Sequence, residues 1–185
     1  MKEIYVIRHG QTDWNLEEII QGNQNVPLNA CGRKQAEELK NKLKNIKFDY
    51  IISSSLSRAI ETAKIATDNK INIKIDSRLR ERRYGELEGK SQYCLEDFKC
   101  ASNELWSYDL NYSKYGIEPI NSFVERVYSV LDDIKKQDFD TILLSTHAVV
   151  SVAIKYYFEG KNNSQFFMIQ DAMKNCECRK YIIGG

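Results

Sequence analysis

Arg8, His9 and Gly10 are the residues of this sequence whose types and spacing point most directly to chemistry. They follow an apolar, β-rich run. A neutral imidazole is a competent nucleophile, an arginine fork binds phosphate oxygens, and a glycine lets the backbone approach a ligand. The sequence has one other histidine, His147, which also follows an apolar run. Two histidines at strand ends predict one site that accepts a phosphoryl group.

Transfer of a phosphoryl group needs fixed positive charge, an in-line nucleophile and an acid for the leaving oxygen. We predict His9 as the nucleophile. Arg8 and Arg58 supply planar forks that match phosphate oxygens. Arg58 follows the serine run Ser53–Ser55 and falls in the first turn of an expected helix, where free N–H groups already favour an anion.

His147 and Glu81 complete the predicted catalytic set. His147 stands at an expected strand-to-helix junction with the N–H of Ala148 beside it. As an imidazolium, His147 would donate to the phosphoryl oxygens. Glu81 is the predicted acid that protonates the leaving alkoxide and then the base that activates water on the phosphohistidine. Alone, a histidine is often a structural core residue and a glutamate a surface carboxylate, so the prediction rests on the combination.

The elements that position these residues alternate between strands and helices. Apolar runs and period-2 alternation predict strands, and apolar residues spaced three to four apart predict helices. The predicted strands are Lys2–Ile7, Phe48–Ile52, Ile71–Ile75, Thr141–Ser145 and Lys180–Ile183. One predicted helix begins after an N-cap at Asn29, and three more cover Leu56–Thr67, Phe123–Ile134 and Ala148–Phe158. This order predicts an α/β fold, a three-layer α/β/α sandwich around a mostly parallel sheet. Ligands of such sheets bind beyond the carboxyl ends of the strands, where both histidines lie.

The length of the chain suits one domain. Its 185 residues show no change in composition that argues for two, so we expect a single domain over residues 1–185. Residues 90–119 fit the alternation poorly and are rich in aromatic side chains. We expect a helical or irregular, lid-like insertion there.

Composition limits the partners and the type of chemistry. The 27 Lys and Arg residues balance 26 Asp and Glu residues, so the charge favours neither nucleic acid nor an anionic membrane as the main partner. No apolar stretch approaches the ~20 residues that span a bilayer, and the N-terminus does not resemble a signal peptide, so we expect a cytoplasmic protein. The motifs of serine hydrolases, P-loops and zinc proteases are missing from the sequence, and we predict no metal and no cofactor.

Four segments in order resemble the histidine phosphatase superfamily, the phosphoglycerate mutase-like proteins. They are residues 8–15 (RHGQTDWN), 54–63 (SSLSRAIETA), 79–89 (LRERRYGELEG) and 145–148 (STHA). The resemblance implies a phosphoglycerate mutase-like fold and transfer through a covalent phosphohistidine on His9, without a metal. It also implies contacts to phosphate or to the substrate body from Asn15, Gln21 and Gly22.

The resemblance leaves two reactions open. A phosphatase admits water to the phosphohistidine, whereas a cofactor-dependent phosphoglycerate mutase returns the phosphoryl group to a bound phosphoglycerate. The run from Glu81 to Gly85 resembles the mutase form, in which residues at the positions of Arg82 and Tyr84 hold phosphoglycerate. Mutases, however, carry a pair of arginines after a tryptophan in the insertion, and here Trp106 is followed by Ser-Tyr-Asp. We therefore predict a phosphatase that acts on a small-molecule phosphate monoester.

A non-catalytic phospho-ligand-binding protein on the same fold is the alternative from a different class. Binding would need Arg8, Arg58 and His147, but it would not need His9 and Glu81 together. The presence of both therefore favours an enzyme. The sequence names neither the physiological substrate nor the oligomeric state.

Overall fold

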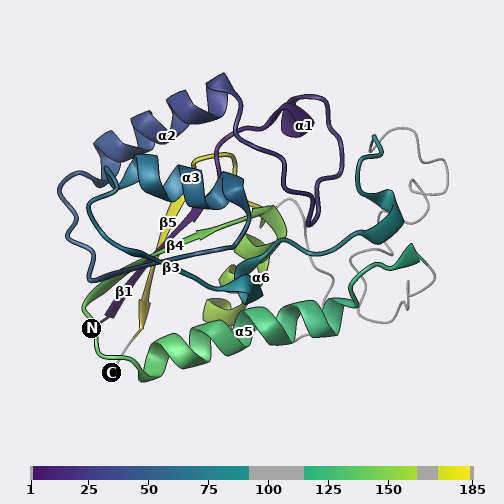
Figure 1. The fold of residues 1–185 in the computed structure, drawn as a ribbon. Coiled ribbons are helices and arrows are strands. Elements are labelled where there is room, and N and C mark those ends of the chain that lie inside the picture. The colour runs from purple at the N-terminus through teal and green to yellow at the C-terminus, as the bar shows by residue number, and fades with distance from the viewer. Residues whose placement is uncertain (1, 92–114, 162–170, 184–185) are drawn as a thin grey trace.

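The computed structural model describes residues 2–91, 115–161 and 171–183. Its centre is a sheet of five strands: β1 (Lys2–Arg8), β2 (Tyr50–Ser53), β3 (Ile73–Ile75), β4 (Thr141–Thr146) and β5 (Cys178–Ile183). The strands lie in the order β3-β2-β4-β1-β5. Strands β3, β2, β4 and β1 pair in parallel with their neighbours, and β5 pairs antiparallel with β1 (Figure 1). The sheet is therefore mostly parallel, as predicted.

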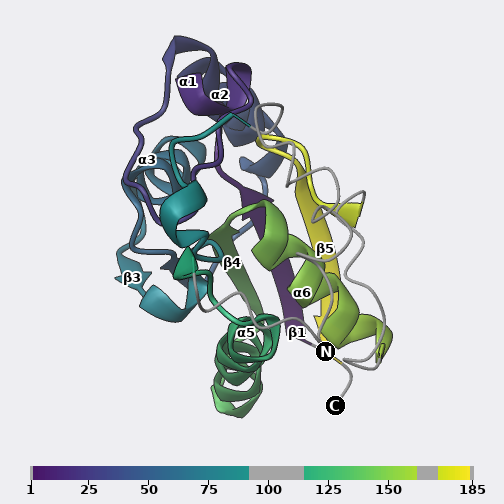
Figure 2. The ribbon, with the colours of Figure 1, turned by 90° about the vertical axis from the view of Figure 1, so that its right-hand side faces the viewer.

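Helices cover both faces of the sheet. The helices of the described residues are α1 (Asp13–Leu16), α2 (Ala30–Leu43), α3 (Ser57–Ala66), α5 (Ile120–Lys136) and α6 (Ala148–Glu159), with short 3₁₀ turns η1 (Ser77–Leu79) and η2 (Gly85–Leu87). Figures 1 and 2 show α2 and α3 on one face and α5 and α6 on the other. The three-layer α/β/α architecture predicted from the alternation of elements is confirmed.

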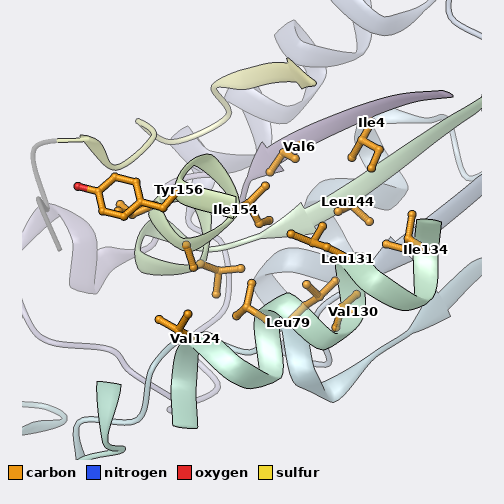
Figure 3. Close-up of a cluster of buried hydrophobic side chains, with 14 of the residues drawn as sticks. Ile4, Val6, Leu79, Val124, Val130, Leu131, Ile134, Leu144, Ile154 and Tyr156 are labelled. Carbon is orange, nitrogen blue, oxygen red and sulfur yellow. The ribbon is translucent and has the colours of Figure 1, made fainter. Parts of the chain in front are cut away.

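The alternation of side chains along each strand fills the two layers. In β4, Ile142 and Leu144 pack with α5 and α6, whereas Leu143 between them packs with α2 and α3. Such continuous apolar runs are typical of parallel strands that are buried on both faces. Figure 3 shows the α5 side of this core, where Leu131 and Ile134 lie against Leu144.

The register of the parallel strands brings the two histidines together. Arg8 of β1 pairs with Thr146 of β4, so His9 and His147 are the next residues on adjacent strands. On the other side of β4, Ser53 of β2 pairs with Ser145, and the chain turns from there into α3. The carboxyl ends of β1, β4 and β2 therefore meet at one edge of the sheet, and the site forms beyond that edge.

The predicted elements differ from the observed ones mainly at their ends. Asn29 caps α2 as predicted, because its side chain accepts a hydrogen bond from the N–H of Gly32. Helix α5 begins three residues before the predicted apolar face and ends two residues after it. The short helix α1 lay outside the prediction, and a capping box between Thr12 and Asn15 stabilises it.

Most of the expected insertion at 90–119 lies outside the described residues, which stop at 91 and resume at 115. Where the chain is described again, Glu118 already contacts Arg82 and Arg83, and Pro119 precedes α5. Within the described ranges, no helix is long and apolar enough to cross a bilayer.

Candidate active site

His9 directly follows β1 and is buried at the edge of the sheet. Its N–H donates to the carbonyl of Thr146 (3.0 Å), which continues the β1–β4 ladder by one residue. Its side-chain Nδ1 lies 2.7 Å from the carbonyl oxygen of Gly10. Because a carbonyl only accepts, Nδ1 carries the hydrogen and Nε2 keeps its lone pair. Burial, and then the charges of Arg58 and Arg8, hold the pKa of His9 well below its usual range, which favours this neutral form.

Gly10 places the chain after His9 in direct contact with α2. A Cβ at Gly10 would lie 2.4 Å from the carbonyl oxygen of Gly32, and a Cβ at Gly32 would lie 2.1 Å from that of Gln11. The N–H of Gly10 donates to Oγ1 of Thr62 on α3 (3.0 Å). The carbonyl that orients His9 is therefore held by two helices, and only glycine fits at the crossing.

Arg8 and Arg58 each use their terminal nitrogens to hold backbone carbonyls. Nη1 of Arg8 donates to Met173 (2.7 Å), whereas Nη1 and Nη2 of Arg58 donate to Gln24 (2.6 Å) and Gly22 (2.8 Å). The Nε atoms of both arginines are buried and find no acceptor among the described residues. Each guanidinium thus holds backbone carbonyls through its terminal nitrogens and keeps an Nε donor without an acceptor in the described part of the chain. That the two arginines bind phosphate oxygens stays a prediction.

The charge of both guanidinium groups is concentrated in a buried region. Burial lowers the pKa of Arg58 to about 10, and it also lowers the pKa of Arg8. The carboxylate of Glu81 opposes the shift in both cases. Both arginines therefore remain cations at neutral pH, beside His9 and in a site with little water to screen them.

His147 is the N-cap residue of α6 and is fully buried. Its ring centroid lies 5.2 Å from that of His9. Nε2 lies 2.7 Å from Oγ of Ser54, and Nδ1 is buried with no partner in the part of the chain that the structure describes. Burial, then Arg58, His9 and Arg8, hold the pKa of His147 well below its usual range. The predicted imidazolium is thus disfavoured in the free protein, and the neutral ring is favoured.

Glu81 presents its carboxylate to backbone N–H groups. Oε1 accepts from Arg82 (2.9 Å) and Oε2 accepts from Val149 in the first turn of α6 (3.1 Å). Burial raises the pKa of Glu81, although these two hydrogen bonds and the charges of Arg58 and Arg8 act in the opposite direction. A carboxyl group with a raised pKa is suited to donate a proton.

A second set of residues was predicted to contact phosphate or the substrate body. Oδ1 of Asn15 accepts from the N–H of Thr12 (3.1 Å) and from Nδ2 of Asn175 (3.3 Å). Gln21 is buried, and its Oε1 has no partner within the described ranges. Gly22 adopts a positive φ of 49° and offers its carbonyl to Arg58. Gly22 is thus connected to Arg58. Asn15 is connected to the His9 backbone through Asn175, whose Nδ2 donates to both.

Arg82, Tyr84 and Ala148 complete the predicted set. Arg82 and Tyr84 are buried, and the guanidinium carbon of Arg82 lies 5.8 Å from the centroid of the Tyr84 ring. Nε of Arg82 donates to the carbonyl of Glu118 (2.9 Å). Ala148 begins α6 as predicted, and the N–H of the next residue, Val149, donates to the Glu81 carboxylate.

A sequence model of the histidine phosphatase superfamily (branch 1) matches residues 4–183. The chain belongs to this superfamily. It is 36% identical over 157 residues to phosphoglycerate mutase-like protein 4 of Arabidopsis thaliana, a match that covers 80% of this chain and 67% of the relative. It is 40% identical over 91 residues to the uncharacterized phosphatase PhoE of Bacillus subtilis (strain 168), covering 48% of this chain and 47% of PhoE, so this match spans about half of either protein.

Solved structures of histidine phosphatase relatives share the fold. The structure named Bacillus stearothermophilus YhfR has a TM-score of 0.79 to this chain and is 29% identical, covering 89% of this chain and 83% of that one. The family resemblance stated from the four sequence segments and the predicted fold class are both confirmed.

Three contacts of this histidine phosphatase site were missed from the sequence. Ser54 holds His147, Thr62 holds the N–H of Gly10, and Nδ2 of Asn175 donates to the carbonyl of His9 (2.9 Å). Ser54 belongs to a serine run at a strand end, which was a usable signal. No sequence signal pointed to Asn175, because it lies 166 residues from His9 in the chain. Across the described residues, no three His, Cys, Asp or Glu side chains are grouped so as to hold a metal ion.

Proposed function

We propose that this protein is a phosphatase that hydrolyses a small-molecule phosphate monoester through a phosphohistidine on His9. One observation carries the proposal. Three buried nitrogens near His9 have no acceptor among the described residues: Nε of Arg8, Nε of Arg58 and Nδ1 of His147. A buried donor without a partner costs free energy, and the oxygens of a phosphoryl group are the acceptors that two cations and an imidazole favour.

In the first step, the lone pair on Nε2 of His9 attacks phosphorus. The bond between phosphorus and the ester oxygen breaks, and that oxygen takes the proton of the Glu81 carboxyl as it leaves. The hydrogen bond from Nδ1 to the carbonyl of Gly10 supports the positive charge that develops on the ring. Arg8, Arg58 and His147 stabilise the charge on the phosphoryl oxygens.

In the second step, water attacks the phosphorus of the phosphohistidine. Glu81, now a carboxylate, takes a proton from the water, and the phosphorus–nitrogen bond returns its electron pair to His9. The products are an alcohol and inorganic phosphate, and Glu81 is protonated again. The raised pKa of Glu81 supports both roles, because the group must gain and lose a proton in each cycle.

The neutral tautomer of His147 supports a donor role without a third cation. Oγ of Ser54 accepts from the N–H of Leu56 (3.3 Å), so its own hydrogen is available to Nε2 of His147. With Nε2 accepting, the ring hydrogen lies on Nδ1, the nitrogen that has no partner among the described residues. A neutral His147 therefore donates to a phosphoryl oxygen through Nδ1.

A covalent intermediate is the direct test. The protein is mixed with ³²P-labelled 4-nitrophenyl phosphate and quenched within milliseconds, with His9→Gln as the control. We expect a label on the wild-type protein that is stable in base and labile in acid, and no label on His9→Gln. Wild-type protein that turns over without any label would overturn the covalent mechanism.

A phosphoglycerate mutase is the second candidate, and one observation favours it. Arg82 and Tyr84 are buried directly after Glu81, in the segment that resembles the mutase form. Against it, the sequence has no arginine pair after Trp106 to grip a second anionic group. The protein is supplied with 3-phosphoglycerate and 2,3-bisphosphoglycerate, and isomer and free phosphate are measured. We expect phosphate release to dominate; isomer formation far ahead of phosphate release would assign the mutase.

A further inference from the structure

Arg126 of α5 and Glu118 form an ion pair beside the segment that carries Glu81. Nε and Nη2 of Arg126 donate to the two carboxylate oxygens of Glu118 at 2.6 and 2.8 Å. The two side chains are only 21% and 16% exposed. A bidentate pair that is shielded from solvent holds both partners in one geometry.

The remaining donors of Arg126 hold three backbone carbonyls in this segment. Nη1 donates to Arg78 and to Arg80 (2.8 Å), and Nη2 donates to the carbonyl of Glu81 itself (3.1 Å). One guanidinium therefore fixes the chain on the N-terminal side of the Glu81 carboxyl.

Glu118 holds the residues that follow Glu81. Its N–H donates to the carbonyl of Arg83 (2.9 Å), and its Oε2 accepts from the N–H of Arg83 (3.2 Å). Its carbonyl accepts from Nε of Arg82 (2.9 Å). Arg126 and Glu118 together therefore contact the backbone or side chain of each residue from 80 to 83.

We propose that Arg126 and Glu118 are positioning residues for the general acid, and this inference rests on the proposed function of Glu81. The Glu81 carboxylate is oriented by the N–H of Arg82 and by that of Val149 on α6. The first of these N–H groups belongs to the clamped segment, so its place relative to α6 depends on the clamp. Loss of the clamp moves the carboxyl away from the leaving oxygen, and proton transfer depends on that alignment.

Arg78 of η1, whose side chain contacts α5, provides a matched control. Nη1 of Arg78 donates to Asp133 of α5 (2.8 Å), and Nη2 donates to Asp76 (2.8 Å). Its side chain thus ties η1 to α5, and within the described residues its hydrogen bonds go to Asp76, Ser129 and Asp133 rather than to residues 80–83. Arg78→Met removes a comparable set of ion pairs without releasing Glu81.

The test compares substrates with good and poor leaving groups. For Arg126→Met and Glu118→Gln, we expect kcat/KM to fall about 100-fold for an alkyl phosphate and less than about threefold for 4-nitrophenyl phosphate, since a good leaving group needs no acid. Arg78→Met should lower kcat/KM by the same factor for both substrates, or leave it unchanged for both. An equal fall across both substrates in Arg126→Met would overturn the inference.

A double variant separates positioning from general loss of stability. If Arg126 acts through Glu81, Glu81→Gln combined with Arg126→Met reacts no more slowly with the alkyl phosphate than Glu81→Gln alone. A double variant whose loss of activity is the product of the two single-variant losses would overturn the inference. Where Arg126→Met does not fold by circular dichroism, Arg126→Lys is judged by the same two criteria, because one ammonium cannot reach all the acceptors of a guanidinium.

Failure of the proposed function is distinguishable from failure of this inference. A wild-type protein without phosphohistidine, or a Glu81→Gln variant that slows both substrates equally, removes Glu81 as the acid and the clamp with it. Only the positioning role of Arg126 and Glu118 is overturned if the wild-type protein carries the label and Glu81→Gln shows the leaving-group effect, but Arg126→Met does not show that effect.

Discussion

Oγ of Ser54 and Nε2 of His147 lie 2.7 Å apart, and both side chains are fully buried. Ser54 follows β2 and His147 follows β4, so the hydrogen bond connects two neighbouring strand ends. The N–H of Ser54 also donates to the carbonyl of Ser145 on β4 (3.0 Å). The serine is therefore fixed by the same sheet edge that fixes the imidazole, and it sets which ring nitrogen carries the hydrogen.

Ser54→Ala should remove the hydrogen bond that selects the tautomer of His147. We expect a loss of about 1–3 kcal/mol in unfolding free energy, because Nε2 is left buried without a partner, and a fall in kcat/KM of about tenfold. The neighbouring Ser53→Ala is the control: its Oγ is equally buried and donates to the carbonyl of Ser54 (3.0 Å), away from His147. It should cost about 1 kcal/mol and leave kcat/KM unchanged.

Nitrogen NMR reads the tautomer directly. The chain has only two histidines, so the ring signals are assigned with one variant. Wild-type His147 should be protonated at Nδ1, and Ser54→Ala should show a mixture of tautomers. A wild-type ring protonated at Nε2 would contradict the donor role of Nδ1.

Gly10→Ala should disturb the crossing of the His9 loop with α2. The added Cβ would meet the backbone of Gly32 at 2.4 Å, and a backbone atom cannot rotate away. We expect a loss of about 1–3 kcal/mol in stability from overpacking. The carbonyl that orients His9 shifts as well, so activity should fall about 100-fold.

Gly160→Ala is the matched control for this substitution. Gly160 ends α6 with a φ of 63°, and its added Cβ would meet nothing within 4 Å. The cost should be about 1 kcal/mol from the left-handed conformation, with activity unchanged. Thermal unfolding and turnover of 4-nitrophenyl phosphate measure both variants. Equal activities of the two would show that the crossing does not position His9.

The sequence predicted the strand ends but not what connects them. His9 and His147 could be placed together because apolar runs define β1 and β4, and parallel strands end at one edge. Arg126 could not be recognised, since a lone arginine among the apolar positions of α5 looks like a solvent-facing residue. Glu118 and Asn175 reach the site from outside the matching segments, and only tertiary contacts reveal them.

Asn175→Ala should loosen the backbone of the nucleophile. Nδ2 of Asn175 donates to the carbonyl of His9 and to Oδ1 of Asn15. We expect a loss of about 1 kcal/mol in stability and a fall in kcat of up to about tenfold. Lys174→Ala, at the exposed neighbouring position, should change neither. A variant Asn175→Ala with unchanged kcat would show that β1 alone holds His9.

Stability should fall in mild acid because of the two buried histidines. The pKa of each lies well below its usual range in the folded protein, so the unfolded chain binds protons first as pH falls below about 6.5. The stabilisation from these neutral rings is therefore complete above that pH and is lost as pH falls toward their folded pKa values. The slope is at most about 1.4 kcal/mol per pH unit for each histidine.

Glu81 acts in the opposite direction. Its pKa is raised in the folded protein, so its contribution is complete below its unfolded pKa and is lost as pH rises through the folded one. Urea unfolding at intervals between pH 7.5 and 4.5 measures the balance. His147→Gln should have a shallower decline below pH 6.5 than the wild-type protein, and Glu81→Gln a steeper one. A His147→Gln variant that declines in parallel with the wild type would mean that His147 titrates equally in the folded and unfolded chains.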